Sequence, residues 1–195
     1  MSAGQLNYTP LVNWLKGRGH NQYTQFGEDG LIAGCLEQIG ETTRQCFEIG
    51  AADGRFFSNT LRLREQGWQA VLIEANKTQF SKLQEEFGEQ SECIWETCSD
   101  LDATLSKTSL CTAPDLGVID IDGQDWWMWS DLQRYRPRVL LIETAAGAAT
   151  SPVPDRGAPG QAGLDAIRQL GEQKGYTLTA TTYCNALFVE STQLV

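Results

Sequence analysis

The chain has 195 residues, and 41% of them are hydrophobic, which is enough for one domain (1–195) that buries well over half of its unfolded surface without a metal or disulfide. A net charge of -10, with no run of Lys or Arg, argues against a nucleic-acid partner, because a phosphate-binding surface needs clustered basic residues. No basic leader precedes an apolar segment, and no window approaches the roughly 18 apolar residues that span a membrane. We therefore expect a cytoplasmic protein with no membrane partner.

The cysteines are expected to be reduced core thiols. They form no Cys-x-x-Cys pair, and His20 is the only histidine that could help them bind a metal, so a zinc site is not expected. The cysteines are Cys35, Cys46, Cys93, Cys98, Cys111 and Cys184.

The residues before the first strand-like run predict an N-terminal helical cap (1–44) with helices near 9–16 and 29–39. From residue 45 to 195, strand-like runs alternate with helical patterns. Strands are expected at 46–50, 68–75, 92–96, 115–123, 137–144, 176–182 and 185–190, and helices at 58–67, 78–88, 100–107, 125–135 and 163–175. The helix at 58–67 can be capped by Ser58 and stopped by Gly67. This alternation predicts a Rossmann-like, doubly wound α/β core (45–195) with a mostly parallel sheet.

The end of the chain departs from this pattern. Only Tyr183 and Cys184 separate the last two strand-like runs, and such a short connection predicts an antiparallel hairpin whose final strand runs against the rest of the sheet. One long loop, 145–163, is rich in Gly, Pro and Ala and follows the fifth strand. A loop of this length in a compact domain is more often functional than filler, so we expect a lid.

Four of the expected strands finish on an acid, namely Glu48, Glu74, Asp122 and Glu143. In an open parallel sheet the carboxyl ends of the strands line the ligand crevice, so these side chains are expected to converge on one rim. The alternative for each acid is that it caps the helix that follows it.

The first of these acids begins a glycine turn, EIGAADG, at residues 48–54. A dinucleotide site would bring backbone N–H groups against a pyrophosphate here, but Asp53 would place one anion beside another, and no Gly-Lys-Ser/Thr follows as in a P-loop. A ligand with an adenosine, no phosphate and two positive centres suits an acid-lined glycine turn, and S-adenosylmethionine is such a ligand. Glu74, at the end of the second strand, is then placed to accept hydrogen bonds from the ribose hydroxyls.

An ordered set of motifs along the chain resembles a known family. The motifs are YTQFGEDG (23–30), EIGAADG (48–54), IEAN (73–76), IDIDGQD (119–125) and the terminal NALFV (185–189). Together they resemble the class I S-adenosylmethionine-dependent methyltransferases, and the FkbM-like methyltransferases in particular. The resemblance covers approximately residues 22 to 189 and implies the class I methyltransferase fold and S-adenosylmethionine as the cofactor.

The resemblance also implies which residues bind the cofactor. Glu48, Gly50, Ala52 and Gly54 would hold its methionine part, Glu74 its ribose, and Ser99 with Asp100 would approach its adenine. The segment that would close over the cofactor contains Gln25, Gly27, Glu28 and Asp29, and the adjoining candidates are Asp53, Ala75 and Asp120.

Methyl transfer to a hydroxyl needs an aligned acceptor and a base or metal that removes the proton. The candidate catalytic residues are Asp122, Asp125, Glu143 and His20. Histidine titrates closest to neutral pH, but His20 lies in a Gly-rich loop, where such a residue is more often at the surface. The carboxylates of Asp120, Asp122 and Asp125 could hold Mg²⁺, but an acid as deep in a strand as Asp120 is more often hydrogen-bonded structurally, so a metal is not favoured.

Three indoles follow these acids at Trp126, Trp127 and Trp129, and neighbouring helical positions cannot all face the core. Trp127 is therefore a candidate wall for a flat or cationic acceptor, and Tyr23 is a second substrate-binding candidate. The acidic balance and the long loop favour a small-molecule acceptor, such as a hydroxyl on a sugar or other natural product.

Two other functions stay open. An NAD-linked oxidoreductase can use the same fold, but it would need a phosphate-compatible turn, and no Tyr-x-x-x-Lys proton donor occurs. A non-catalytic cofactor-binding or scaffold protein would keep Glu74 and the glycine turn while losing the acceptor site.

Overall fold

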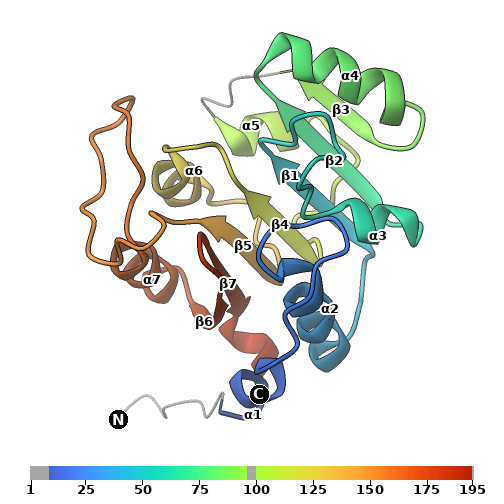
Figure 1. Ribbon diagram of the computed structural model, residues 1–195. Coiled ribbons are helices and arrows are strands. Elements are labelled where there is room, and N and C mark those ends of the chain that lie inside the picture. The colour runs from blue at the N-terminus through green and yellow to red at the C-terminus, as the bar shows by residue number, and fades with distance from the viewer. Residues whose placement is uncertain (1–8, 96–99, 195) are drawn as a thin grey trace.

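The computed structural model describes residues 9–95 and 100–194, which form one seven-stranded sheet with helices on both faces (Figure 1). The strands are β1 (Gln45–Ile49), β2 (Gln69–Glu74), β3 (Glu92–Trp95), β4 (Leu116–Ile119), β5 (Val139–Glu143), β6 (Tyr176–Thr181) and β7 (Asn185–Glu190). The helices are α1 (Thr9–Leu15), α2 (Glu28–Ile39), α3 (Leu61–Glu65), α4 (Lys77–Phe87), α5 (Leu101–Leu105), α6 (Asp125–Asp131) and α7 (Leu164–Gln173), followed by the short 3-10 helix η1 (Ser191–Leu194). Every expected strand and helix has a counterpart; Cys98, Ser99 and the end of the expected third strand lie outside the described residues.

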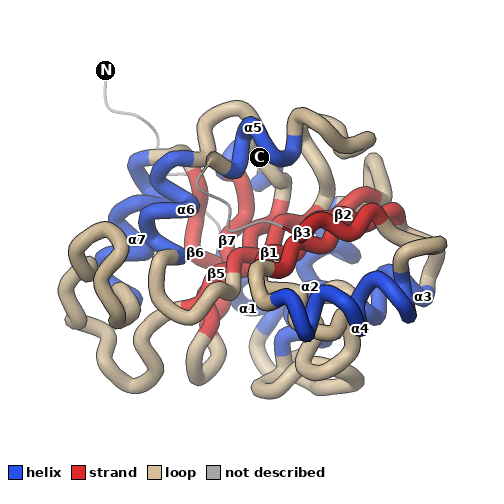
Figure 2. The backbone as a smooth tube through the Cα atoms, turned by 90° about the horizontal axis from the view of Figure 1, so that it is seen from above, coloured by secondary structure: helices blue, strands red, loops and turns tan. Residues whose placement is uncertain are grey.

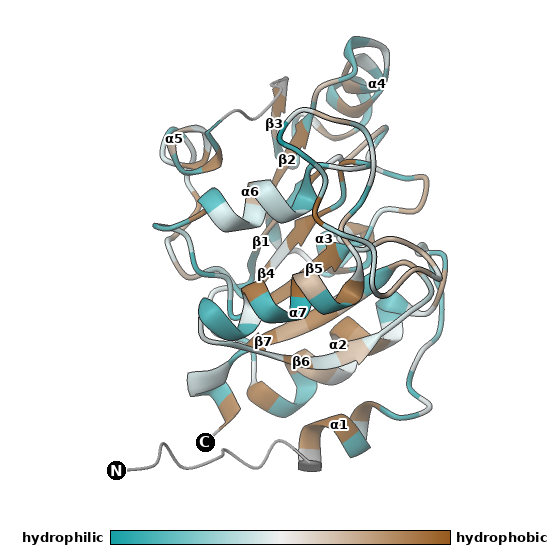
Figure 3. Ribbon diagram, turned by 90° about the vertical axis from the view of Figure 1, so that its left-hand side faces the viewer, coloured by the Kyte–Doolittle hydropathy of each residue, from teal (hydrophilic) through white to brown (hydrophobic). Residues whose placement is uncertain are grey.

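Alternate residues of the strands face two different helical layers. On β1, Cys46 contributes to the core cluster under α1, α2, α3 and α4, whereas Phe47 and Ile49 contribute to the cluster under α5, α6 and α7. Figure 2 shows the two helical layers on opposite sides of the sheet, and Figure 3 shows apolar strands between them. Burial on both faces explains why the central strands read as continuous apolar runs.

The strand order is β3-β2-β1-β4-β5-β7-β6, and β1 to β5 run parallel. β7 is antiparallel to both β5 and β6, so the last strand lies inside the sheet and β6 forms its edge. The expected Rossmann-like, mostly parallel α/β fold with an antiparallel C-terminal hairpin is confirmed. The strand order reverses between β1 and β4, and sheets of this kind bind ligands in the crevice at the carboxyl ends of such strands.

The two expected N-terminal helices are also present. α2 packs under β5 and β7, where Leu31, Ile32 and Leu36 are core residues, and α1 packs beside α2 and the edge strand β6. Within residues 9–95 and 100–194, no helix combines the length and the apolar composition needed to cross a membrane.

α3 and α6 fall furthest short of the helix lengths that their sequence patterns predict. α3 begins at Leu61 rather than Ser58, because residues 58–60 are bound to Glu48; the Ser58 hydroxyl still accepts the Leu61 N–H at 3.2 Å. α6 ends at residue 131 rather than 135, because the Asp102 carboxylate accepts the N–H groups of residues 133–135. In both places a carboxylate from another element competes with the helix for backbone N–H groups.

Candidate functional site

Two adjoining cavities lie at the carboxyl edge of the sheet. The Glu74 cavity has a volume of about 420 Å³ and lies at the carboxyl ends of β2, β1 and β4. The Glu143 cavity has a volume of about 250 Å³ and lies at the carboxyl ends of β1, β4 and β5 and at the amino end of β7. Residues that line both cavities are Gly50, Ala52, Asp120 and Asp122. The four acids expected on one rim therefore do gather there, with Glu74 at one end and Glu48 and Glu143 at the other.

The predicted cofactor-binding residues divide into two groups. Those that line one or both cavities are Gln25, Glu28, Glu48, Gly50, Ala52, Glu74, Ala75 and Asp120. Those that line neither cavity are Gly27, Asp29, Asp53, Gly54 and Asp100, and Ser99 lies outside the described residues.

The glycine turn is fixed to the end of β2. The N–H groups of Gly50 and Ala51 both donate to the Ile73 carbonyl oxygen, at 3.0 and 3.1 Å, and the Ala52 N–H donates to Glu74 Oε2 at 2.8 Å. Gly50 has φ +79°, and an added Cβ would lie 1.7 Å from the Asp120 carbonyl oxygen. Only glycine fits so close to the end of β4.

Glu74 lies between this turn and α4, where its carboxylate is accessible from the Glu74 cavity. Its Oε1 accepts the Asn76 N–H at 2.6 Å, and its Oε2 accepts the Ala52 N–H. Each carboxylate oxygen can accept a further hydrogen bond, so Glu74 can still receive two donors from a ligand.

The rest of the glycine turn serves the fold. An added Cβ at Gly54 would lie 2.5 Å from Leu83 and 2.8 Å from Phe87, so this glycine allows α4 to pack closely. Partial burial raises the pKa of Asp53, but hydrogen bonds from the N–H groups of Phe56 and Arg55 outweigh this effect and hold the pKa below its usual value. Asp53 therefore stabilises its own turn and, like Gly54, does not line a cavity.

Glu48 binds the segment just before α3, which agrees with the alternative that a strand-end acid caps the next helix. It is 3% exposed, and its oxygens accept the Asn59 N–H (2.7 Å) and the hydroxyls of Ser58 (2.8 Å) and Thr60 (2.5 Å), just before α3. It lines the Glu143 cavity, but its first role is to fasten the 58–60 segment to β1.

The segment before α2 contributes two buried acids with different roles. Asp29 Oδ2 accepts the N–H groups of Gln22, Tyr23 and Thr24, so Asp29 folds its own loop. Glu28 instead ties this segment to β7, because its Oε1 accepts the Thr182 hydroxyl at 2.6 Å and the Asn185 amide at 3.2 Å.

The acids between β4 and β5 repel one another. Burial and the Glu143 carboxylate raise the pKa of Asp120 to about 8, and burial and the Asp125 carboxylate raise that of Glu143 to about 7. Oε2 of Glu143 has no hydrogen-bond donor among the described residues. The Glu143 cavity is therefore a place where a positive charge would be stabilised.

Asp122 is not on the fourth strand as expected, whereas Asp125 begins its helix as expected. β4 ends at Ile119, so Asp122 is not on the strand; it is exposed, has φ +57° and lines both cavities. The Asp125 oxygens accept the N–H groups of Ile121 and Gly123, both at 2.9 Å, and burial raises its pKa to about 6. Asp125 thus holds the turn that presents Asp122.

His20 and Tyr23 do not reach the cavities. His20 is exposed and lies between the Arg18 carbonyl oxygen (3.1 Å from Nδ1) and the Arg62 guanidinium (3.3 Å from Nε2). The Tyr23 hydroxyl donates to Glu65 at 2.5 Å, on the side of α3. Neither residue is placed to contact a ligand at the carboxyl edge.

Trp127 faces the chain's own long loop instead of a cavity. Its Nε1 donates to the Pro154 carbonyl oxygen at 2.9 Å, and the Arg156 guanidinium lies 4.4 Å from its ring centroid. The face of this indole, expected to contact an acceptor, is therefore in contact with a cationic side chain of the protein itself. Trp129 is buried against Phe188, with ring centroids 4.9 Å apart, so it is a core residue.

The loop at 145–163 is closed on itself and rises beside α6 (Figure 1). The Ala145 N–H donates to the Ala162 carbonyl oxygen at 2.9 Å, and Gln124 is bonded to the loop through Gly157 and Ala158, at 2.8 Å each. The loop is therefore fastened to α6, and none of its residues lines the Glu74 cavity or the Glu143 cavity, so the expected lid gains no support.

Asp100 caps α5 by accepting the Ala103 N–H at 2.9 Å, away from both cavities. Sequence reasoning missed several lining residues, namely Phe56, Phe57, Gln79, Met128, Cys184 and Asn185. Asn185 begins the NALFV motif, so its position in that motif was a signal available in the sequence.

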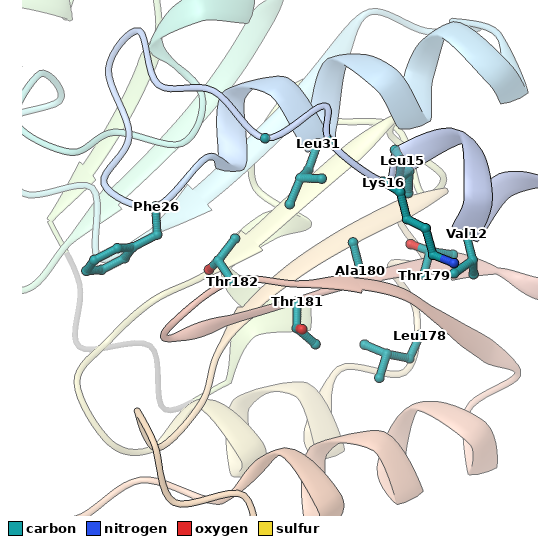
Figure 4. A pocket seen from close by; sticks show the side chains of 12 residues that line it. Val12, Leu15, Lys16, Phe26, Leu31, Leu178, Thr179, Ala180, Thr181 and Thr182 are labelled. Carbon is teal, nitrogen blue, oxygen red and sulfur yellow. The ribbon is translucent and has the colours of Figure 1, made fainter.

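A further cavity of about 620 Å³ lies between α1, Phe26, Leu31 and the edge strand β6 (Figure 4). It is lined mainly by apolar and threonine side chains, and none of the strand-end acids lines it. Among residues 9–95 and 100–194, no group of three or more His, Cys, Asp or Glu side chains could hold a metal ion, so the Mg²⁺ alternative gains no support.

Neither a protein-family model nor a curated protein sequence matches the chain. Solved structures match its fold. A TehB-like SAM-dependent methyltransferase from Corynebacterium glutamicum is 14% identical, with a TM-score of 0.54 over 94% of this chain and 96% of that one. The magnesium protoporphyrin IX methyltransferase ChlM from Synechocystis, solved with bound SAM, is 14% identical, with a TM-score of 0.52 over 98% and 100% of the two chains. The CMeT domain of the citrinin polyketide synthase is 10% identical, with a TM-score of 0.57 over 84% and 51%. At these identities the likeness shows the fold, which is the Rossmann-like α/β fold that those methyltransferases share.

Proposed function

We propose that the chain is a S-adenosylmethionine-dependent methyltransferase of the FkbM-like kind, which methylates a hydroxyl on a small molecule such as a sugar or other natural product. The observation that carries the proposal is the pair of adjoining cavities at the carboxyl edge, one ending on Glu74 and the other lined by acids. The fold shared with known methyltransferases supports it.

The residues at the junction of the cavities fit this cofactor. Glu74 keeps acceptor capacity for two ribose hydroxyls, and the Glu74 cavity extends past it to Ala75 and Met128. Asp120 and Asp122, at the junction, favour a sulfonium or an ammonium and disfavour a pyrophosphate. The same acids argue against an NAD-linked oxidoreductase.

When bound, the cofactor would supply an electrophilic methyl group, to be transferred in line to the acceptor oxygen with the neutral thioether of S-adenosylhomocysteine as the leaving group. Asp122 lines both cavities, so its carboxylate would align the acceptor hydroxyl and accept its proton. Asp125 would keep the 121–123 turn in place.

Calorimetric titration with S-adenosylhomocysteine and with NAD tests the cofactor. We expect S-adenosylhomocysteine to bind the parent protein and Glu74→Ala to weaken it by about 10- to 100-fold, because charge-assisted hydrogen bonds of roughly 1.5 to 3 kcal/mol are lost. Glu85→Ala, an exposed change on α4, is the matched control. Binding of NAD without S-adenosylhomocysteine would overturn the proposal.

The non-catalytic alternative requires a separate test, because such a protein could bind the cofactor equally well. Asp122→Asn keeps the size of the side chain but removes its basicity. We expect affinity for S-adenosylhomocysteine, which lacks the sulfonium charge, to persist while methyl transfer to a panel of small hydroxyl compounds is lost. A parent protein that binds S-adenosylhomocysteine but methylates none of the panel would favour the scaffold function.

A further inference from the structure

A buried amide oxygen at the inner end of the Glu143 cavity lacks a hydrogen-bond donor. Asn185 is 5% exposed, begins β7 and lines this cavity. Its Nδ2 donates to Glu28 Oε1 at 3.2 Å and to Cys184 Sγ at 3.5 Å, which assigns Oδ1 as the free end of the amide. No donor among the described residues reaches Oδ1. An unpaired buried acceptor is costly, so Oδ1 is a position where a donor on a ligand would be stabilised.

A second unpaired acceptor lies on the neighbouring strand. Glu143 and Asn185 are directly paired residues of β5 and β7. Glu143 Oε2 also lacks a donor among the described residues, although hydrogen bonds from the Gln161 side chain and the Asp122 N–H to this carboxyl group oppose the rise of its pKa. Further carboxylates line the same cavity, and none of its described lining residues is Lys, Arg or His. A protonated amine offers both the hydrogen-bond donors and the positive charge that these groups lack.

Exposed aromatic side chains stand at the mouth of the same cavity. Phe56 and Phe57, 66% and 41% exposed, line it with ring centroids 3.8 Å apart. Phe26 and Tyr183, 46% and 63% exposed, form a second pair at 5.2 Å, but they line neighbouring cavities rather than this one. Phe57 also has φ +56°, an unfavourable backbone conformation for this residue. Exposed rings gathered at a cavity mouth are typical of a binding surface for an apolar group.

We propose that the acceptor is an amine with an aromatic or large apolar body. Its ammonium group binds between Asn185 Oδ1 and Glu143 Oε2, and its body lies against the exposed rings of Phe56 and Phe57. The ammonium is a binding handle, and the hydroxyl to be methylated lies nearer Asp122. This inference rests on the proposed function and narrows the acceptor from any small hydroxyl compound to a cationic, amphipathic one.

The cofactor also carries an ammonium group, but it would bind elsewhere. A cofactor with its ribose at Glu74 would have its sulfonium at the junction of the cavities, by Gly50 after β1. β5 and β7 are the second and third strands from β1, which is about 10 to 14 Å across the sheet at the usual strand spacing. The amine site at Glu143 and Asn185 is therefore on the acceptor side of the junction.

Three matched phenols test the amine site by calorimetry in the presence of S-adenosylhomocysteine. Tyramine, tyrosol and 4-hydroxyphenylacetate share a ring, and their side chains end in an ammonium, a hydroxyl and a carboxylate. We expect tyramine to bind at least about tenfold more tightly than tyrosol, and the carboxylate to bind most weakly, because the cavity offers acceptors and negative charge.

Two variants separate the ammonium site from the aromatic mouth. Glu143→Gln keeps the side chain's shape and should lower tyramine affinity about tenfold while leaving tyrosol affinity unchanged. Phe57→Gly suits the positive φ and should weaken both ligands to the same extent. Glu85→Gln, exposed on α4, is the matched control for loss of a carboxylate.

The proposal is overturned if tyramine and tyrosol bind the parent protein equally, if the carboxylate binds best, or if none of the three binds. Loss of S-adenosylhomocysteine affinity in Glu143→Gln, equal to the loss for tyramine, would assign the amine site to the cofactor instead. If S-adenosylhomocysteine fails to bind the parent protein, the proposed function fails. The affinities of the three phenols, measured without S-adenosylhomocysteine, then still test whether the amine site exists.

Discussion

Gly50 leaves no room for a side chain where the two cavities meet. Its added Cβ would lie 1.7 Å from the Asp120 carbonyl oxygen at φ +79°, whereas Gly67, at φ +84°, has nothing within 4 Å of an added Cβ. We predict that Gly67→Ala costs about 1 kcal/mol of unfolding free energy for its left-handed backbone alone. Gly50→Ala should cost more than about 3 kcal/mol, because the end of β4 must also shift. Urea denaturation measures both values, and similar losses would contradict this steric account.

The repelling acids make the stability of the protein dependent on pH. Asp120 and Glu143 have pKa values raised to about 8 and about 7, so between about pH 4 and pH 8 the folded state binds more protons than the unfolded state. Stability from this source is complete below the unfolded pKa values and is lost as pH rises through the folded ones. We predict that the unfolding free energy falls by at least about 1 kcal/mol between pH 5 and pH 8.

Asp120→Asn is the variant that tests this assignment. The amide cannot ionise, so urea denaturation at several pH values should give a shallower decline than in the parent protein, with the largest gain near pH 8. The same slope in parent and variant would show that other groups produce the pH dependence.

At the scale of single residues, the sequence predicted positions better than partners. The positions of Glu74 and Gly50 at the carboxyl edge could be predicted, because Glu74 ends β2 and Gly50 follows β1 directly. The hydrogen-bond partners of Glu48 and Asp29 could not be predicted. They depend on how the chain folds back after the glycine turn and before α2. Trp127 shows the same limit, since Pro154 and Arg156 reach it only through the folded loop.

At the scale of elements, a buried ion pair at the amino edge of the sheet joins three segments. Arg138 Nη1 donates to Asp115 Oδ1 at 2.7 Å, and the same guanidinium donates to the carbonyl oxygens of Ile39 and Gly40 at the end of α2. Asp115 also accepts the N–H groups of residues 42–44. The pair thus fixes the chain between α2 and β1.

We predict that Arg138→Met lowers the unfolding free energy by about 3 to 5 kcal/mol, because it leaves a buried carboxylate without its cation. The side chains of Asp115 and Arg138 are only 0% and 9% exposed. Arg168→Met, which breaks exposed pairs with Asp165 and Glu172, should cost less than about 1 kcal/mol. Equal effects of the two variants in urea denaturation would contradict the role of the buried pair.

The long loop depends on Trp127 for its anchorage. We predict that Trp127→Ala, which removes the hydrogen bond to Pro154 and the stacking on Arg156, increases tryptic cleavage after Arg156 about tenfold. Trp127→Phe keeps a ring for the guanidinium and should have an intermediate effect. Mass spectrometry identifies the cleaved bond, and unchanged cleavage in both variants would show that other contacts hold the loop.

The elements themselves were predictable, but their lengths were less so. The apolar runs of β1, β2 and β5 and the short link between β6 and β7 fix strand type, because burial on both faces and a two-residue connection leave few alternatives. The early end of α6 was not predictable, because the Asp102 carboxylate that ends it belongs to α5.

At the scale of the whole molecule, the alternation of strands and helices predicted the doubly wound sheet, but not the position of every strand within it. A hairpin pattern requires β6 and β7 to be neighbours and leaves open which of them joins β5. The structure places β7 there, and this brings Asn185 next to Glu143. The acid rim could therefore be expected from the sequence. The motif marked Asn185 as a candidate, but its place beside Glu143 depends on which hairpin strand joins β5.

The inward position of β7 has a consequence for synthesis of the chain. β6 leaves the ribosome first but, among the described strands, pairs with β7 alone, and β5 keeps an unpaired edge until β7 arrives. A nascent chain that ends before Asn185 therefore exposes open strand edges, which favour association with other chains. When β7 inserts, it joins the two parts of the sheet and brings Asn185 to the cavity in the same event. A partly made chain thus has neither a complete sheet nor a complete acceptor site, so its capacity to bind an amine can report that folding has finished.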